Sequence, residues 1–307
     1  MEQRILGRGG PPVPVIGFGA WPIGGGMGAV DEAAAMRTVH HALDHGVTLI
    51  DTAEAYRSSE ETLGKALHSW SGTRDRIFLA TKVRGTDLSR EHIQRAIGES
   101  LRQLRTDYVD LLQAHSWDAG HPIDETMRAF EELTRSGKVR FAGVSNFTVP
   151  QMEAARAVSA VQSLQPAYSL LARGAEAEIL PYCLAQGIGV LAHSPLAKGL
   201  LTGKYTPQTV FPADDERSRM PRFGGEEGRR NLDTAGRLRV WAEARGHTLV
   251  ELAIAWVLSN PAVTVCLCGA KSPQQVDDHV RAAAWKLSAA DRAEVEALLA
   301  AGGPGGA

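Results

Sequence analysis

The sequence contains little cysteine and no excess of charge of either sign. Among 307 residues there are three cysteines, Cys183, Cys266 and Cys268, and they form no C-x-x-C pair. An odd number of cysteines without that motif argues against a disulfide framework or a zinc site and favours a reducing compartment. The formal net charge of -2 provides no global attraction to nucleic acid or an anionic membrane. We therefore expect a small molecule as the partner.

Long apolar runs and the common nucleotide-binding motifs are also absent. No uninterrupted apolar stretch reaches the ~18 residues that cross a bilayer, and the first residues lack the apolar centre of a signal peptide. These absences predict a cytoplasmic protein that does not bind membranes. The G-x-G-x-x-G fingerprint fails because Pro22 stands where its last glycine is required, and no P-loop spacing occurs.

Short apolar runs alternate with amphipathic segments, which is typical of a parallel sheet covered by helices on both faces. Eight runs are predicted as strands: 15–20, 47–51, 77–82, 108–115, 140–146, 161–165, 188–194 and 263–269. Helices are predicted over 31–45, 59–70, 89–104, 124–135, 149–158, 175–186, 232–245 and 249–258. Eight strands, each followed by helix, predict an α/β fold of the (β/α)8 TIM-barrel type.

Several segments fall outside this alternation. Turn residues between short apolar pieces at 6–14 predict a hairpin that closes the bottom of the barrel. Segment 199–230 is too long for an ordinary connection and is predicted to be either a cofactor loop or a disordered linker. A last helix over 288–300 and a flexible tail over 301–307 would complete a single barrel domain, 1–307. Ser58 with Glu61, and Ser272 with Gln275, predict capping boxes at two helix starts.

Polar residues end six consecutive predicted strands. In a barrel of this type the carboxyl ends of the strands form one rim, where catalytic groups lie. The residues are Asp51, Lys82, His115, Ser145 with Asn146, Gln165, and His193 with Ser194. A single pair such as Asp51 and Lys82 could be a structural ion pair. Six strands that end in this way indicate an active site.

Tyr56 follows Asp51 by five residues and is predicted to lie in the loop above the same strand, beside Lys82. A phenol with a pKa of ~10 donates its proton poorly at neutral pH, and a close ammonium is expected to lower that pKa. Asp51 would hold Lys82, and His115 would bond to the reacting oxygen. These groups suit protonation of a carbonyl oxygen while another group attacks its carbon. The structural alternative for Tyr56 is an ordinary surface tyrosine.

Six strings of the sequence together resemble the aldo-keto reductase superfamily, in order and over nearly the whole chain. They are DTAEAYRSSE at 51–60, TK at 81–82, GVSNF at 143–147, QPAYSLL at 165–171, SPLAKGLLTGKY at 194–205 and CGAKSPQQVDDH at 268–279. The resemblance implies a catalytic tetrad of Asp51, Tyr56, Lys82 and His115, with Tyr56 as general acid and NADPH as hydride donor. It implies further cofactor contacts from Ser145, Asn146 and Gln165 at the nicotinamide carboxamide, and from Ser194, Leu196, Lys198 and Gly199 beneath the pyrophosphate.

The nucleotide end of this predicted site has a separate physical argument. Ser272 and Pro273 begin a helix directly after the last strand, and the free N–H groups of a helix start attract phosphate. Lys271 adds a full charge near Gly269, so NADP(H) is favoured over NAD(H). A solvated lysine beside an ordinary helix cap is the structural alternative.

Four places depart from the family's pattern. Arg57 replaces a glycine after the catalytic tyrosine and is expected to reach either the substrate entrance or solvent. His193 replaces an aromatic ring that stacks on nicotinamide. Gln275 replaces an arginine that clamps adenosine, and Asp278 with His279 replaces a Glu–Asn pair. All of these positions are still predicted to contact the cofactor, except Arg57.

Two tryptophans and two histidines complete the list of candidate residues. Trp21 and Trp117 follow strand ends and are predicted to wall a pocket for an aldehyde or ketone, the alternative being core packing. His41 and His45 are four residues apart and could face the same way as metal ligands. Because no third ligand stands nearby, we expect them to complement the helix dipole, and we expect no metal site.

Three functions fit these observations. The first is a cytoplasmic NADPH-dependent reductase of aldehydes or ketones. The second is a cofactor-binding regulatory subunit without significant catalysis, because potassium-channel β-subunits resemble the same family. The third is a lyase in which Lys82 forms a Schiff base, and it is disfavoured because Asp51 should keep that amine protonated. The sequence does not distinguish a monomer from a homo-oligomer.

Overall fold

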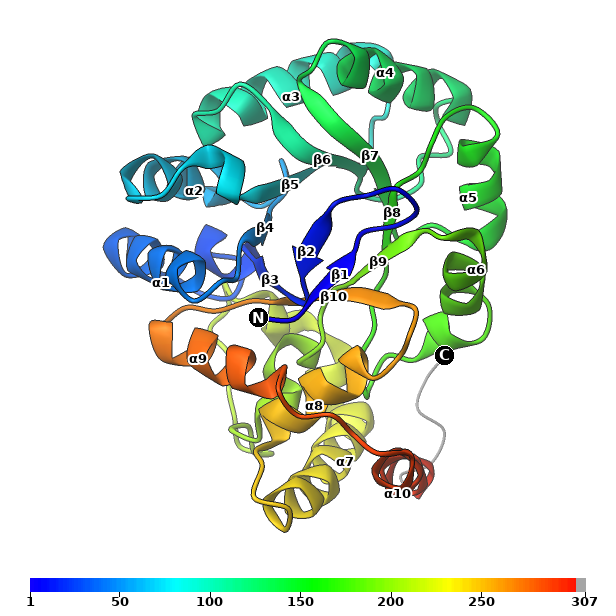
Figure 1. The fold of residues 1–307 in the computed structure, drawn as a ribbon. Coiled ribbons are helices and arrows are strands. Elements are labelled where there is room, and N and C mark those ends of the chain that lie inside the picture. Colours follow the sequence, from blue (N-terminus) through cyan, green and yellow to red (C-terminus); the bar gives the residue numbers. More distant parts are fainter. Residues whose placement is uncertain (302–307) are drawn as a thin grey trace.

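Eight parallel strands close into a barrel in the computed structural model, which describes residues 1–301 (Figure 1). The strands are β3 (Ile16–Gly19), β4 (Leu49–Asp51), β5 (Phe78–Val83), β6 (Val109–Ala114), β7 (Val139–Ser145), β8 (Ser163–Gln165), β9 (Gly189–Ala192) and β10 (Val263–Cys268). They pair in chain order, and β10 pairs with β3 to close the barrel. The predicted (β/α)8 fold is confirmed. Residues 302–307 of the tail predicted over 301–307 lie outside the described residues.

Helices follow the strands and surround the barrel (Figure 1). They are α1 (Glu32–Asp44), α2 (Ser59–Ser69), α3 (Arg90–Leu104), α4 (Ile123–Arg135), α5 (Val149–Arg156), α6 (Ile179–Gln186), α7 (Gly225–Glu243), α8 (Leu249–Leu258), α9 (Pro273–Ala282) and α10 (Ala289–Ala300). The largest difference from prediction is α7, which starts at Gly225 rather than at 232. Its first turns carry glycine and charge but no apolar residue, so they gave no periodic signal.

Strand alternation explains how polar groups come to lie inside the barrel. Leu49, Ala80 and Leu111 belong to the apolar cluster of the barrel interior. Side chains two positions apart on a strand share a face. The next inward side chains are therefore those of Asp51, Lys82 and Gln113, at the carboxyl ends of β4, β5 and β6.

The N-terminal hairpin closes the opposite end of the barrel. Its strands β1 (Gln3–Ile5) and β2 (Pro12–Pro14) pair antiparallel, so the hairpin begins earlier than the predicted residue 6. Leu6 and Val13 are fully buried and join the interior cluster. This packing leaves the carboxyl end of the barrel as the place for a site.

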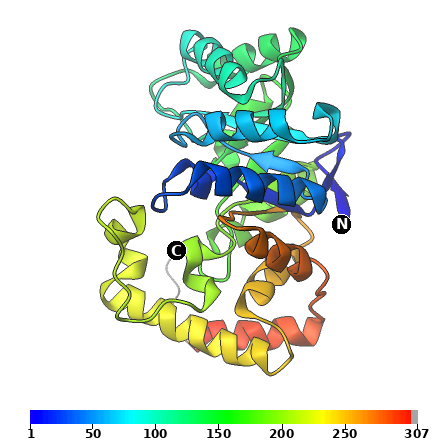
Figure 2. The same cartoon turned by 90° about the vertical axis from the view of Figure 1, so that its left-hand side faces the viewer.

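The long segment between β9 and α7 lies at that carboxyl end, opposite the hairpin (Figure 2). It contains the short helices η4 (Ala197–Thr202), η5 (Glu216–Arg219) and η6 (Pro221–Phe223). The rings of Tyr205, Phe211 and Phe223 pack edge to face, with centroids 5.1–6.0 Å apart. The segment therefore has a small apolar centre of its own, which a disordered linker would lack.

The two predicted capping boxes are not formed as expected. Ser58 makes no capping bond, because its backbone is near-helical (φ -84°, ψ 6°) rather than extended. Ser272 does cap α9 through the Gln275 N–H at 3.4 Å, but the Gln275 side chain accepts from the Lys271 N–H instead of returning to Ser272.

Two further observations concern the cysteines and the helices. Cys183, Cys266 and Cys268 are all free and buried. No helix in the described part of the chain is long and apolar enough to span a membrane.

Candidate active site

A cavity of about 680 Å³ opens at the carboxyl ends of the strands. It is lined by Trp21, Asp51, Tyr56, His115, Ser145, Asn146, Gln165, His193, Ser194, Leu196, Lys198, Gly199, Gly269, Lys271, Gln275, Asp278 and His279 among the predicted site residues. Lys82 is 1% exposed and does not itself line the cavity, but it is hydrogen-bonded to Asp51 and Tyr56, which do. The fold thus brings nearly all of the predicted residues to one site.

The floor of the cavity is a hydrogen-bonded line of three ionisable groups. Lys82 Nζ donates to Asp51 Oδ1 at 2.5 Å, to the Thr52 carbonyl at 2.8 Å and to Tyr56 Oη at 3.3 Å. Burial alone would lower the pKa of Lys82, but Asp51 and Tyr56 outweigh it and raise that pKa. Lys82 therefore carries its proton at neutral pH, which makes it unsuited to attack a carbonyl carbon.

Two buried amides hold the other oxygen of Asp51. Gln165 Nε2 donates to Asp51 Oδ2 at 2.8 Å, and Gln113 Nε2 donates to the same oxygen at 3.3 Å. Gln165 also donates to Gln113 Oε1 at 3.2 Å. A buried carboxylate with both oxygens hydrogen-bonded is fixed in position. Gln113 was missed in the sequence because the predicted strand extended to His115, which placed Gln113 inside the strand rather than at its end.

The pKa of Tyr56 departs from the sequence-based expectation. Burial raises it, and although Lys82 acts to lower it, the net direction is upward. The prediction of a net lowering by Lys82 is wrong for this structure, because the sequence revealed the cation but not the depth of the phenol. At neutral pH Tyr56 therefore carries its proton.

His115 and His193 are uncharged groups in the cavity wall. Burial, followed by the charge of Lys82, lowers the pKa of His115 to about 4 and that of His193 to about 3. His193 Nε2 lies 3.1 Å from Asn146 Oδ1, and its Nδ1 lies 3.0 Å from Ser194 Oγ. Since an amide oxygen only accepts, His193 is protonated on Nε2. Its ring is fixed in orientation by both bonds.

Asn146 and Ser194 occupy strained backbone positions beside that ring. Their φ angles are 57° and 58°, in the left-handed region that non-glycine residues seldom adopt. Asn146 Nδ2 donates to the His115 carbonyl at 3.1 Å and to Ser145 Oγ at 3.0 Å. Backbone strain of this kind concentrates at functional sites, which supports a ligand-binding role for this part of the cavity wall.

The mouth of the cavity is crossed by contacts from η5. Glu216 Oε1 accepts from Trp21 Nε1 at 2.7 Å and from Lys198 Nζ at 2.6 Å. Trp21 also packs edge to face on Tyr56, with ring centroids 4.9 Å apart. The long segment therefore reaches from β9 across to the loop after β3.

Positive charge gathers at the far end of the cavity. Lys204, Arg217 and Lys271 line it, and Lys271 Nζ donates to the carbonyls of Met27 at 2.5 Å and Gly28 at 3.3 Å. Burial, and then the charge of Arg217, lowers the pKa of both lysines. Arg217 pairs with Asp215. Three cations with one paired carboxylate favour an anionic ligand.

Three expectations do not match this geometry. Trp117 does not line the cavity and packs on Phe147, with ring centroids 5.4 Å apart. Ser272 is turned to its helix cap and does not line the cavity either. Arg222, the predicted cofactor contact from segment 199–230, does not line the cavity, whereas Lys204 and Arg217 of that segment do. Arg57, by contrast, is exposed, as one of its two predicted alternatives requires, and it donates to the Gly25 carbonyl at 2.7 Å.

Comparison with known proteins identifies the family. The model of the Aldo/keto reductase family matches residues 15–300. Aldo-keto reductase YhdN of Bacillus subtilis is 38% identical, over 97% of this chain and 94% of the relative. A probable voltage-gated potassium channel subunit beta of Arabidopsis thaliana is 34% identical, over 92% of this chain and 91% of the relative.

Solved structures agree with the sequence relatives. The glycerol dehydrogenase AKR11B4 from Gluconobacter oxydans has a TM-score of 0.88 and 35% identity, covering 98% of this chain and 96% of its own. An aldo/keto reductase from Klebsiella pneumoniae in complex with NADP and acetate has a TM-score of 0.77 and 30% identity, covering 97% of this chain and 96% of its own. By sequence, fold and coverage, the chain belongs to the aldo/keto reductase family.

Proposed function

We propose that the protein is an NADP(H)-dependent oxidoreductase that reduces an aldehyde or ketone to the alcohol, with Tyr56 as general acid. One observation carries this proposal: the buried ammonium of Lys82 donates to the phenol oxygen of Tyr56 at the floor of the cavity. Membership of the family and the relative in complex with NADP support the cofactor.

The donor groups of the cavity fit an NADP(H) molecule. The cations Lys204, Arg217 and Lys271 would hold its phosphates at one end. The polar groups of Ser145 and Asn146, beside the fixed ring of His193, would hold the nicotinamide at the other. When bound, the cofactor supplies the hydride that the side chains of this chain cannot supply.

Tyr56 is well arranged to give its proton to a substrate. Its oxygen accepts from Lys82, so its own O–H is free to point into the cavity. As the proton leaves, the phenolate oxygen gains charge next to the Lys82 ammonium. An interaction that strengthens with this charge stabilises the transition state more than the ground state.

Asp51 and His115 assist this transfer in different ways. Asp51 keeps Lys82 charged and pointed at the phenol, and Gln113 and Gln165 keep Asp51 in place. His115 is neutral, and its ring centroid lies 5.5 Å from that of Tyr56, so it can bond to the same carbonyl oxygen. The substrate would then lie between Tyr56, His115 and Trp21.

The direct test is NADPH oxidation by the purified protein over a panel of aliphatic, aromatic and sugar aldehydes and ketones. We expect turnover with at least one class of carbonyl compound. The packed rings of Trp21 and Tyr56 give the cavity an apolar wall, and this wall favours compounds with an apolar group next to the carbonyl. Absence of turnover over the whole panel would contradict the proposal.

A regulatory subunit is the alternative function, and a specific observation favours keeping it. The relative from Arabidopsis thaliana carries the name of a probable potassium channel subunit beta. A regulatory binder would bind NADPH without sustained turnover.

A Schiff-base lyase is disfavoured by the raised pKa of Lys82. We also propose a cytoplasmic location, which the three free cysteines support.

Replacing Lys271 by alanine should weaken NADPH binding far more than NADH binding. The 2′-phosphate distinguishes the two cofactors, and loss of one charge-assisted contact costs about 1.5–3 kcal/mol. Titration against tryptophan fluorescence measures both dissociation constants. Lys286, exposed and paired with Glu2 on the far side of the molecule, provides the control variant Lys286→Ala. Equal losses for both dinucleotides would refute the assignment of Lys271.

NADPH should slow proteolysis of the segment between η4 and α7. This segment carries Lys204 and Arg217 into the cavity, and a bound phosphate would tie both to the barrel. Limited proteolysis followed by mass spectrometry should locate cleavage at 203–224 in the free protein and a lower rate with NADPH. A cleavage rate that does not respond to cofactor would reduce the segment to a connecting loop.

A further inference from the structure

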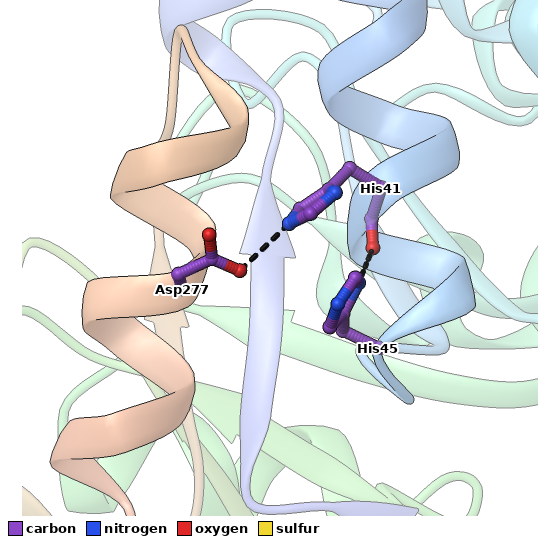
Figure 3. A group of neighbouring side chains, drawn as sticks. All are labelled: His41, His45 and Asp277. Atoms are coloured by element: carbon purple, nitrogen blue, oxygen red, sulfur yellow. Dashed lines mark hydrogen bonds and ion pairs between the residues drawn. The ribbon is translucent and has the colours of Figure 1, made fainter.

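A cluster of two histidines and one aspartate lies outside the cavity, on the outer surface of the barrel. His41 and His45 are in the last turn and the C-cap of α1, and Asp277 is on α9 (Figure 3). Each offers one ligand atom, and these atoms lie within 4.8 Å of one another. The sequence provides only the histidine pair, and the third residue follows His41 by 236 positions.

We propose that His41, His45 and Asp277 form a binding site for a divalent transition-metal ion such as Zn²⁺, which links α1 to α9. The first support is the donor set. Two imidazoles and one carboxylate, with water in the fourth position, are ligands that Zn²⁺ accepts in a tetrahedral arrangement. One negative and two neutral ligands also leave a modest net charge on the loaded site.

The second support is the orientation of the His45 ring. His45 Nδ1 lies 2.8 Å from the His41 carbonyl oxygen. Because a carbonyl oxygen only accepts, Nδ1 carries a proton, and Nε2 is the ring nitrogen left to bind a metal. A backbone carbonyl that fixes the tautomer in this way is a usual partner of metal-bound histidine. His45 thus offers Nε2 to a metal.

The third support is the close approach of the other two ligands. His41 Nε2 donates to Asp277 Oδ1 at 2.7 Å, and a metal bound to both atoms would take the place of that proton, which is released on binding. The rings of His41 and His45 lie 3.9 Å apart at their centroids. In a tetrahedral zinc site with bonds of about 2.0–2.1 Å, neighbouring ligand atoms are about 3.3 Å apart. The side chains of His41 and Asp277 are 26% and 36% exposed, so each has room for the small movement required.

The surroundings leave the carboxylate of Asp277 available. The nearby Arg281 donates to Asp278 at 2.5 Å and also lies 3.5 Å from Glu251. Its charge is therefore engaged by other carboxylates. Among the described residues, His41, His45 and Asp277 form the one group of three His, Cys, Asp or Glu side chains whose ligand atoms lie close enough together to hold a metal ion.

A metal bound here would lie outside the place where the barrel closes. Helix α1 follows β3 and helix α9 follows β10, and these two strands pair to close the barrel. A metal–ligand link would join the first and last strand–helix units. It would also stabilise α9, from which Gln275, Asp278 and His279 line the cavity. The proposal does not depend on the reaction catalysed in that cavity.

The test is a calorimetric titration of the metal-free full chain with ZnCl2, together with thermal unfolding. We expect one site per chain and, at 100 times the dissociation constant, a rise of roughly 5 °C in the unfolding midpoint. The variants His41→Asn, His45→Asn and Asp277→Asn should each bind Zn²⁺ at least about 10-fold more weakly. Circular dichroism of the metal-free variants verifies that each is folded.

His68→Asn is the matched control. His68 is an exposed histidine on α2 and belongs to no such group. This variant should bind Zn²⁺ with wild-type affinity and stoichiometry. Absence of binding at millimolar Zn²⁺, or binding that persists in all three ligand variants, would overturn the proposal.

Discussion

Replacement of Tyr56 by phenylalanine should lower the rate of carbonyl reduction by about 10²–10⁴-fold, the range expected for loss of a general acid. The ring remains, so its edge contacts with Trp21 and His115 are kept. NADPH binding should therefore survive, and the loss should fall on kcat rather than on the dissociation constant of the cofactor. Steady-state kinetics and fluorescence titration measure the two quantities separately.

Tyr182→Phe is the control for this experiment. The Tyr182 hydroxyl accepts from Arg156 at 2.8 Å on the outside of the barrel, away from the residues that line the cavity. Removing it deletes a phenol hydrogen bond without touching the site, and reduction should continue at close to the wild-type rate. A Tyr56→Phe enzyme as active as this control would refute the role of Tyr56.

Replacement of Lys82 by methionine should damage reduction to a comparable degree. It removes the cation that stabilises the developing phenolate, and the pKa of Tyr56, already raised by burial, should rise further. It also leaves Asp51 buried without its ion pair, a change that costs about 3–5 kcal/mol in stability. Thermal unfolding and steady-state kinetics on the same preparation measure both effects.

A second variant separates loss of chemistry from loss of fold. In Asp51→Asn/Lys82→Met the unpaired charge is gone, so stability should recover towards wild type while reduction stays slow. Asp51→Asn alone should be milder than Lys82→Met, because the ammonium remains but is held less firmly. Recovery of reduction in the double variant would mean that Lys82 serves only to neutralise Asp51.

Strand periodicity made the catalytic floor predictable. Asp51 and Lys82 end short, buried apolar runs, and alternation along a strand places them inside the barrel above Leu49 and Ala80. These are local rules, and they need no knowledge of distant residues. The same rules missed Gln113, because a polar residue inside an apolar run looks like an exception rather than a second support for Asp51.

The cationic end of the cavity was less predictable for a physical reason. Arg217 and Lys204 belong to an irregular segment without periodicity, so nothing in their spacing says which of its charges turns inward. Arg217 is located by Asp215 and by the packing of its guanidinium on Phe211, 4.7 Å from the ring centroid. Those contacts exist only after the segment has folded on the barrel.

Two other features could not be predicted for the same reason: the pKa of Tyr56, and the meeting of His41, His45 and Asp277 on α1 and α9. The sequence indicates that Tyr56 has a cationic neighbour, but the energetic effect of burial depends on the whole rim. Likewise, spacing reveals that His41 and His45 share a helix face, whereas Asp277 joins them through the closing of the barrel. Both properties depend on contacts between residues that are distant in sequence.

The proposal that this chain is a carbonyl reductase is tested most directly by counting products per enzyme. Purified protein, excess NADPH and a carbonyl compound identified in the substrate panel should yield alcohol and NADP⁺ in equal amounts, over many turnovers of each enzyme molecule. A regulatory binder would instead consume no more than one NADPH per chain and then stop. Sustained, stoichiometric turnover is the result we predict, and a single-equivalent burst or none would contradict it.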